Sequence, residues 1–246
     1  MVLLILGTVS CVVWFFSMLA GGGGPLILIP LVSALLGTQA VAPVVTTGML
    51  VGNAQRSLFF RSQIDWSLTG WYLPGAIAGA VLGAYCYRWV HLEWLQLIIG
   101  ACLLLMVLNY FCGSRLSHWQ CRAWHFLPVA FINAVGSGLV GSTGPIMNPM
   151  YLSYGLLKEE MIATKSLHKA VLHLVKLAAY LAFGVLSSEH LRYGLVIGLA
   201  GIPANWLGKQ VLAQMSAQQF RQVVFGLIAV SGLWMLWQQR QLLIGL

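Results

Sequence analysis

The chain has 246 residues, of which 59% are hydrophobic and only 7% are charged, and its mean hydropathy is +0.85. Soluble domains carry roughly 25% charged residues, so this composition excludes a soluble globular protein and indicates a polytopic membrane protein. The formal net charge of +8 is modest, and no basic cluster with interleaved aromatic residues occurs, which argues against nucleic acid as a partner.

Long apolar runs predict an all-α fold of about eight transmembrane helices, because each span needs about 20 apolar residues. In chain order the runs are Val2–Ala20, Val41–Phe60, Leu68–Tyr87, Trp94–Phe111, Trp124–Val140, Met161–Leu186, Leu191–Leu207 and Phe220–Trp237. The longest clearly polar connection is only Gly113–Arg122, so almost nothing remains for a soluble domain. We interpret the first run as a retained span, since no charged region precedes it and no signal-peptide cleavage site follows it.

Two glycine-rich segments interrupt the apolar pattern, at Gly21–Pro25 and Gly141–Pro145. At membrane depth such breaks are tolerated only where the freed backbone groups are buried in protein or face water. Each break precedes a segment of about 12 residues, Pro25–Leu36 or Pro145–Leu157, which is either re-entrant or half of a broken helix. A proline in the first turn suits a helix start, whose N–H groups and positive dipole end attract anions. We therefore expect anion contacts at five residues of the breaks: Gly23, Gly24, Ser142, Thr143 and Gly144.

The order of features repeats along the chain. Val45-Thr46-Thr47 aligns with Ala163-Thr164-Lys165, Gly83 with Gly208, and Gly100 with Gly226, all at separations between 118 and 126 residues. This pattern predicts two homologous membrane repeats within one integral membrane domain, at roughly 1–115 and 122–246. An even number of crossings per repeat would make the repeats parallel, and an odd number would invert them.

Three lysines share one stripe of the hydrophobic run Met161–Leu186. At 100° per residue, Lys165, Lys169 and Lys176 fall within about 40° of one another. A charged group at bilayer depth costs roughly 2.5 to 3.5 kcal/mol on insertion scales. Snorkelling in opposite directions is disfavoured, because the outer two lysines lie only ~16 Å apart along a helix in a hydrocarbon core ~30 Å thick. The stripe therefore predicts a water-filled or anion-occupied cavity inside the bundle.

Other polar residues near the stripe are candidates for substrate binding. His168 and His173 flank it by roughly 60° to 80°, and each is either a packed hydrogen-bonding residue or a ligand or proton-relay group. Thr164 lies on the same helix. The matching helix of the first repeat offers Thr46, Thr47 and Asn53, with Arg56 near its end. We expect this helix to supply hydrogen bonds while the second repeat supplies charge.

Carboxylates are too few and too peripheral for cation transport or acid–base catalysis. Asp65, Glu93, Glu159, Glu160 and Glu189 all fall at helix ends or in loops. No P-loop or H-E-x-x-H pattern occurs, and a hydrolase pair of Ser137 or Ser142 with His168 or His173 would leave the duplicated break unexplained. The five cysteines include no C-x-x-C pair, so the sequence predicts no metal site, no cofactor and no disulfide framework.

The chain has four features in common with a known family. They are the glycine-rich break followed by L-x-x-x-P, the second copy of the break about 120 residues on, Ala163-Thr164, and the terminal glycine pairs spaced G-x(16 or 17)-G. In these features the chain resembles the sulfite exporter TauE/SafE family, also called TSUP. This resemblance covers nearly the whole chain. It implies a multi-pass transporter of the prokaryotic inner membrane, with sulfite, sulfonates and other small organic or sulfur-containing anions as substrates. It also implies that Gly21–Pro25 and Gly141–Pro145 lie near the substrate path.

The sequence thus predicts a secondary transporter, not an enzyme, that moves a small sulfur-containing or carboxylated anion by alternating access between the two repeats. An anion channel with a continuous pore is the alternative. Substrate binding is expected to be linked to protonation, while sodium coupling and homo-oligomerisation stay open. Six basic residues fall on one side of the membrane and four on the other, which favours both termini in the cytoplasm under the positive-inside tendency.

Overall fold

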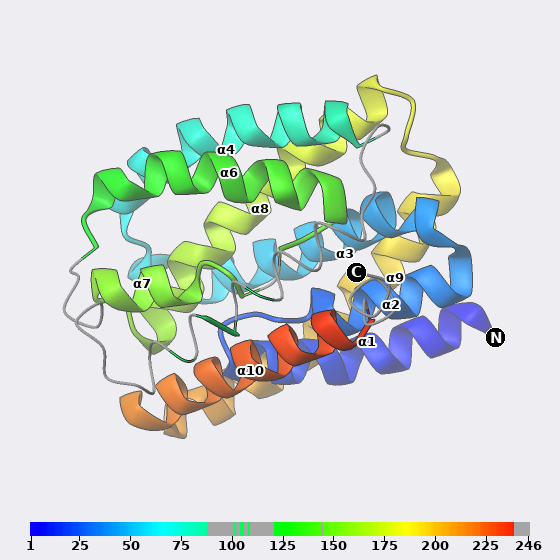
Figure 1. Cartoon of the computed structure of the whole chain (residues 1–246). Coiled ribbons are helices and arrows are strands. Elements are labelled where there is room, and N and C mark those ends of the chain that lie inside the picture. Colours follow the sequence, from blue (N-terminus) through cyan, green and yellow to red (C-terminus); the bar gives the residue numbers. More distant parts are fainter. Residues whose placement is uncertain (88–100, 102–103, 106–107, 109–120, 144, 239–246) are drawn as a thin grey trace.

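The computed structural model describes residues 1–87, 101, 104–105, 108, 121–143 and 145–238 (Figure 1). All regular structure in those residues is helical, which confirms the all-α fold. The predicted run Trp94–Phe111 lies largely outside the described residues. The elements are α1 (Val2–Leu19), α2 (Pro25–Leu36), α3 (Thr38–Phe59), η1 (Arg61–Gln63), α4 (Trp66–Cys86), η3 (Ala123–His125), α6 (Phe126–Val140), α7 (Asn148–Tyr154), α8 (Lys158–Ala182), α9 (Ser188–Gln214) and α10 (Ala217–Gln238).

The distribution of side chains is that of a membrane protein. Three of the described segments are long and apolar enough to cross a bilayer, Val2–Leu19, Ala123–Val140 and Ser188–Gln214, and α2 is a shorter apolar helix. Large apolar side chains on these segments face outward, among them Phe16 and Ile132, which are 60% and 69% exposed. Several polar and charged side chains of the bundle, among them Asn53, Arg56 and Lys176, are buried instead, which is the arrangement that a lipid environment favours.

Helices α3 and α8 pack against each other in the middle of the molecule (Figure 1). Helix α3 also packs on α9, and α8 packs on α4. The outer pairs are α1 with α9 and α4 with α6, so each pair joins a helix of the first half of the chain to one of the second half. The short helices α2 and α7 lie at opposite ends of the bundle in this view.

Glycines allow the helices to approach closely, as small residues do at membrane helix interfaces. Gly75, Gly79 and Gly83 repeat every fourth residue along α4, and a methyl group at any of them would collide with the backbone of α6. Gly194 and Gly198 of α9 pack in the same way against α3. Glycines therefore bring α4 close to α6 and α9 close to α3.

Both predicted breaks are present, and the first has the predicted form. Gly21, Gly22 and Gly23 adopt φ values of +61°, +138° and +98°, a region that favours glycine, and Pro25 begins α2. The second break is longer than predicted. Helix α7 begins at Asn148, so the expected helix Pro145–Leu157 is wrong in its bounds. The reason is that a second proline, Pro149, occupies the first turn of α7, while the carbonyl of Pro145 accepts a turn hydrogen bond from the Asn148 amide at 2.8 Å.

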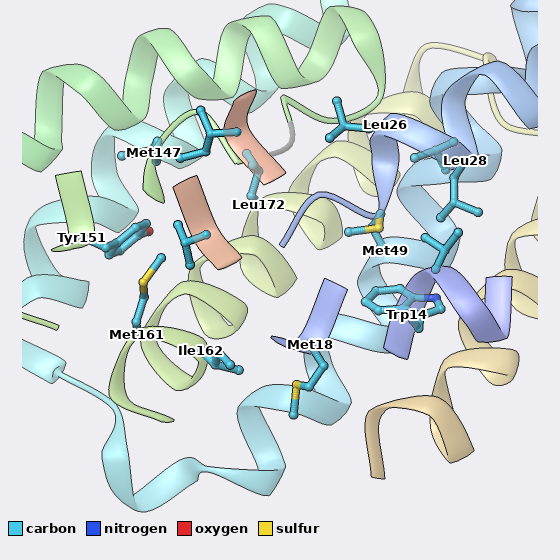
Figure 2. Packing of buried hydrophobic residues seen from close by; sticks show 14 of the residues in the cluster. Trp14, Met18, Leu26, Leu28, Met49, Met147, Tyr151, Met161, Ile162 and Leu172 are labelled. Carbon is cyan, nitrogen blue, oxygen red and sulfur yellow. The ribbon is translucent and has the colours of Figure 1, made fainter. Parts of the chain in front are cut away.

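The apolar core lies on both sides of the breaks. Figure 2 shows Trp14, Leu28 and Met49 gathered where α1, α2 and α3 meet, and Tyr151 and Met161 where α7 meets α8. These side chains fix the position of the polar groups between them.

Candidate functional site

The three lysines of α8 are buried in the protein. Lys165, Lys169 and Lys176 are 5%, 4% and 0% exposed, which excludes snorkelling and confirms the predicted burial of the stripe. Within the described part of the chain the single ion pair joins Lys158 to Glu159 at 3.5 Å, outside the stripe. The buried ammonium groups therefore have no carboxylate partner among the described residues.

Two of the lysines bind carbonyl oxygens at the ends of broken helices. Lys165 Nζ donates to the carbonyl of Gly21, just beyond α1, and to Asn148 Oδ1. Lys176 Nζ donates to the carbonyl of Ser137 at 2.7 Å and to that of Gly141, at the end of α6. The last carbonyls of a helix lack intrahelical partners and carry the negative end of its dipole, so cations stabilise them. The sequence predicted anion contacts of the break amides and of the Ser142 and Thr143 hydroxyls, and did not predict that break carbonyls bind the lysines.

Lys169 is the least committed of the three lysines. Its ammonium makes one long hydrogen bond, 3.4 Å to Thr143 Oγ1. The Thr143 hydroxyl in turn donates to Asn133 Oδ1 at 2.6 Å. Most of the hydrogen-bonding capacity of Lys169 is therefore free within the described structure, although the side chain is buried.

A small cavity lies between the two breaks and the central helices. Its volume open to the centre of a water molecule is about 20 Å³, enough for about one water molecule. The lining carries three cationic side chains and no carboxylate. The residues that line it are Gly21, Gly22, Gly23, Pro25, Met49, Asn53, Arg56, Ser142, Ile162, Lys165, Ser166 and Lys169.

Arg56 brings a charge from the first half of the chain to this cavity, contrary to the expectation that only the second half supplies charge. Its Nε donates to Asn205 Oδ1 and its Nη2 to the carbonyl of Trp14, both at 2.8 Å, and its Nη1 lies 3.3 Å from Ser17 Oγ. The guanidinium also stacks over the Trp14 ring at 4.6 Å.

The sequence contains a signal that relates Arg56 to the lysine stripe. The contact from Arg56 to Ser17 and the contact from Lys176 to Ser137 each join residues 39 positions apart. The two pairs are themselves separated by 120 residues, within the range of the internal repeat. This separation is that of the predicted repeats, which would place Arg56 and Lys176 at matching positions.

Two backbone amides of the first break have no hydrogen-bonding partner in the described structure. Within the described part of the chain, the amides of Gly23 and Gly24 donate no hydrogen bond, whereas the Gly22 amide donates to the Ser17 carbonyl at 2.8 Å. Gly23 borders the cavity, so its amide can face a ligand beside the ammonium groups. Gly24 instead packs toward Val13 and Ser17 and is not a lining residue.

The structure divides the predicted binding residues into two groups. The cavity brings together Gly23, Asn53, Ser142, Lys165 and Lys169. Its lining does not include Gly24, Thr46, Thr47, Thr143, Thr164, His168, His173 or Lys176. Gly144 lies outside the described residues. Sequence reasoning did not select Met49, Ile162 and Ser166, because an isolated apolar or hydroxyl side chain gives no signal of its own.

The threonines outside the lining have local structural contacts. Thr47 donates to the Pro43 carbonyl one turn earlier, at 2.9 Å. Thr164 Oγ1 accepts from the Asp65 amide, also at 2.9 Å, and thereby ties α8 to the start of α4. Thr46 makes a long contact of 3.5 Å to the Gly141 carbonyl, which Lys176 also binds.

The two histidines have opposite environments. The His168 ring nitrogens lie 2.8 Å from the Tyr151 hydroxyl and 2.9 Å from Thr69 Oγ1, and the ring stacks on Tyr72 at 4.0 Å. His168 is thus a packed, fully hydrogen-bonded residue. His173 is equally buried, yet neither of its ring nitrogens has a hydrogen-bonding partner among the described residues.

A comparison with protein families gives a match that covers the residues of the cavity and of both breaks. The family model of the sulfite exporter TauE/SafE matches residues 6–235. The chain belongs to this family. TauE/SafE proteins are membrane transporters, so the resemblance inferred from the breaks is confirmed and the chain is a membrane protein. No curated protein and no solved structure matches the chain.

Proposed function

We propose that this TauE/SafE protein is a secondary transporter of small oxyanions, such as sulfite or an organosulfonate, and that the cavity between the breaks binds them. The observation that carries the proposal is the cavity lining, in which Arg56, Lys165 and Lys169 face one space without a carboxylate. Unpaired buried cations are strongly unfavourable, and a bound anion would neutralise them. The same surplus of positive charge disfavours cation transport.

The remaining lining groups suit a sulfur oxyanion. The hydroxyls of Ser142 and Ser166 and the free amide of Gly23 offer hydrogen bonds to its oxygens. Met49 and Ile162 add an apolar wall, which would accommodate the short carbon chain of a sulfonate. An oxyanion with four heavy atoms is larger than the present space, so binding requires side chains of the lining to move.

Asn148 and Lys165 support an alternating-access mechanism. Asn148 Nδ2 lies 3.4 Å from the Ala20 carbonyl, while Lys165 joins Asn148 to the carbonyl of Gly21. We call these contacts the Asn148 latch. They connect the start of α7 to the end of α1, that is, the second break to the first. An anion that attracts the Lys165 ammonium would weaken the latch, so that binding and opening would be coupled.

The exchanged packing supports the proposal of two repeats. Suppose that α1, α2, α3 and α4 correspond to α6, α7, α8 and α9. The first helix of each repeat, α1 or α6, then rests on the fourth helix of the other repeat, α9 or α4, and the two third helices, α3 and α8, meet at the centre. We propose the same boundaries as above, roughly 1–115 and 122–246, in a multi-pass protein of the prokaryotic inner membrane. Relative movement of the repeats would then expose the central cavity to either side.

The test is uptake into liposomes that contain the purified protein. The panel comprises sulfite, sulfate, thiosulfate, sulfoacetate and short carboxylates, each with and without gradients of protons or sodium. The proposal predicts saturable uptake of at least one sulfur oxyanion. Flux that rises linearly without saturation would indicate a channel, and the absence of uptake for every anion would refute the proposal. Chemical conversion of the substrate would point to an enzyme.

A further inference from the structure

A second group of buried polar atoms adjoins Lys169. Tyr72 of α4, Asn133 of α6 and His173 of α8 are 0%, 7% and 0% exposed. The Tyr72 hydroxyl, Asn133 Nδ2 and both ring nitrogens of His173 have no hydrogen-bonding partner among the described residues. Buried polar atoms in folded proteins nearly always have a partner, so such a group calls for an explanation. None of the three residues lines the cavity between the breaks.

Side-chain contacts connect Asn133 and Tyr72 to the surroundings of Lys169. Asn133 Oδ1 accepts from Thr143 Oγ1 at 2.6 Å, and Lys169 Nζ lies 3.4 Å from the same threonine oxygen. The Tyr72 side chain lies near Asn133 without a hydrogen bond between them, and its ring stacks on His168, the neighbour of Lys169. Lys169 therefore stands beside the Tyr72–Asn133 pair.

His173 lies on the part of α8 whose lysines reach the second break and α6. It follows Lys169 by one helical turn, at about 40° around α8. The next anchored cation, Lys176, binds Ser137, which follows Asn133 by one turn of α6. Along α8, His173 thus lies between Lys169, which reaches Thr143, and Lys176, which reaches Ser137. This part of α8 is near the stretch of α6 that carries Asn133.

Free hydrogen-bond donors exceed free acceptors in this group. Asn133 has an unpaired amide nitrogen, but its oxygen already accepts from Thr143. Tyr72 offers a free hydroxyl, and Lys169 has ammonium hydrogens to spare. A neutral imidazole adds one donor and one acceptor. The occupant that satisfies such a group accepts several hydrogen bonds and carries negative charge.

We propose that Tyr72, Asn133, His173 and Lys169 form a second oxyanion subsite, which takes the same sulfite- or sulfonate-type anion as the central cavity. The proposal rests on the proposed function. Lys169 lines the cavity and also adjoins the second group, so an anion can move from one position to the other while it keeps the same cationic partner. The subsite extends the substrate path into the α4–α6–α8 side of the bundle.

The experiment locates selenite, an anomalously scattering oxyanion, in crystals of the full chain and measures its equilibrium binding. The variants Tyr72→Phe and Asn133→Leu each remove one donor. Tyr85→Phe, on the exposed face of the same helix, is the matched control. We expect selenite within hydrogen-bonding distance of Tyr72 Oη and Asn133 Nδ2. Tyr72→Phe should weaken binding there about tenfold, as the loss of one hydrogen bond to a charged group does, without changing affinity at the cavity.

The possible results distinguish a failure of the second subsite from a failure of the proposed function. Selenite in the cavity alone, with only water beside Tyr72, overturns the subsite and leaves the proposed function standing. Selenite at neither position overturns both. A subsite occupancy that neither variant reduces also overturns the assignment of these donors. Tyr72→Phe keeps the ring and its stacking on His168, so the test remains valid if Asn133→Leu fails to fold.

Discussion

Replacing Lys169 by methionine separates substrate binding from folding. The substitution keeps the length and much of the volume of the side chain but removes its charge. Lys169 is 4% exposed, and its ammonium makes one hydrogen bond of 3.4 Å in the described structure. Little native bonding is therefore lost, and the desolvation of a buried charge is relieved. We expect Lys169→Met to unfold at the same temperature as the wild type, or at a higher one, when no anion is present.

The effect on binding should be large. A hydrogen bond between charged groups contributes about 1.5–3 kcal/mol, and a charge pair 4 Å apart contributes about 4 kcal/mol at an effective dielectric constant of about 20. Arg56 and Lys165 would still neutralise part of the anion. We therefore expect a loss of about 2–3 kcal/mol, or about 30- to 150-fold in the dissociation constant of sulfite. Lys169→Arg should retain only part of the activity, since guanidinium differs in shape and hydration.

The assay is saturable uptake of radiolabelled sulfite into liposomes, with thermal unfolding measured on the same preparations. The matched control is Lys158→Met, which makes the same change at the outer end of α8, beside Glu159, and should transport normally. Wild-type affinity in Lys169→Met would refute the reasoning, because the least committed cation would then play no part in binding.

Three further variants test other parts of the structure. Lys176→Met leaves the carbonyls at the end of α6 without their donor and should lower the free energy of unfolding by about 2–4 kcal/mol; wild-type stability in thermal unfolding would show that this lysine is no cap. Gly22→Ala, at φ +138° and in contact with an ammonium group, should abolish uptake, whereas Gly70→Ala, with open space around it, should not; equal uptake by both would contradict the assigned break geometry. Asn148→Ala removes the latch and should speed modification of a Ser142→Cys variant by water-soluble thiol reagents; an unchanged rate would argue against the latch.

Much of the fold follows from the apolar pattern, because a bilayer leaves the backbone no alternative to helices. The first half-helix, Pro25–Leu36, was predicted to the residue, since a glycine run and a proline together define its start. The second was predicted to begin three residues too early and to end three residues too late; two prolines compete for its first turn, and only the folded chain selects Pro149. The correspondence of the halves stays a proposal.

The candidate site was only partly predictable. Burial of the lysines followed from the energetic penalty for charge in lipid, but their partners did not, since the carbonyls of Gly21 and Gly141 reach α8 only through tertiary packing. Helical spacing places His168 and His173 almost equally near the stripe. Only the structure shows that His168 is satisfied by Tyr151 and Thr69, whereas His173 meets no partner in the described residues.

The central claim is that an oxyanion neutralises the buried cations around the cavity. Its most direct test is a titration of the purified protein in nanodiscs with sulfite, followed by thermal or denaturant unfolding. A ligand that binds only the folded state stabilises it by about 2.7 kcal/mol at 100 times its dissociation constant. The account predicts a stabilisation of the wild type that grows with the logarithm of the sulfite concentration above the dissociation constant, and its near loss in Lys169→Met. It is contradicted if no oxyanion of the panel stabilises the wild type, or if the variant is stabilised equally.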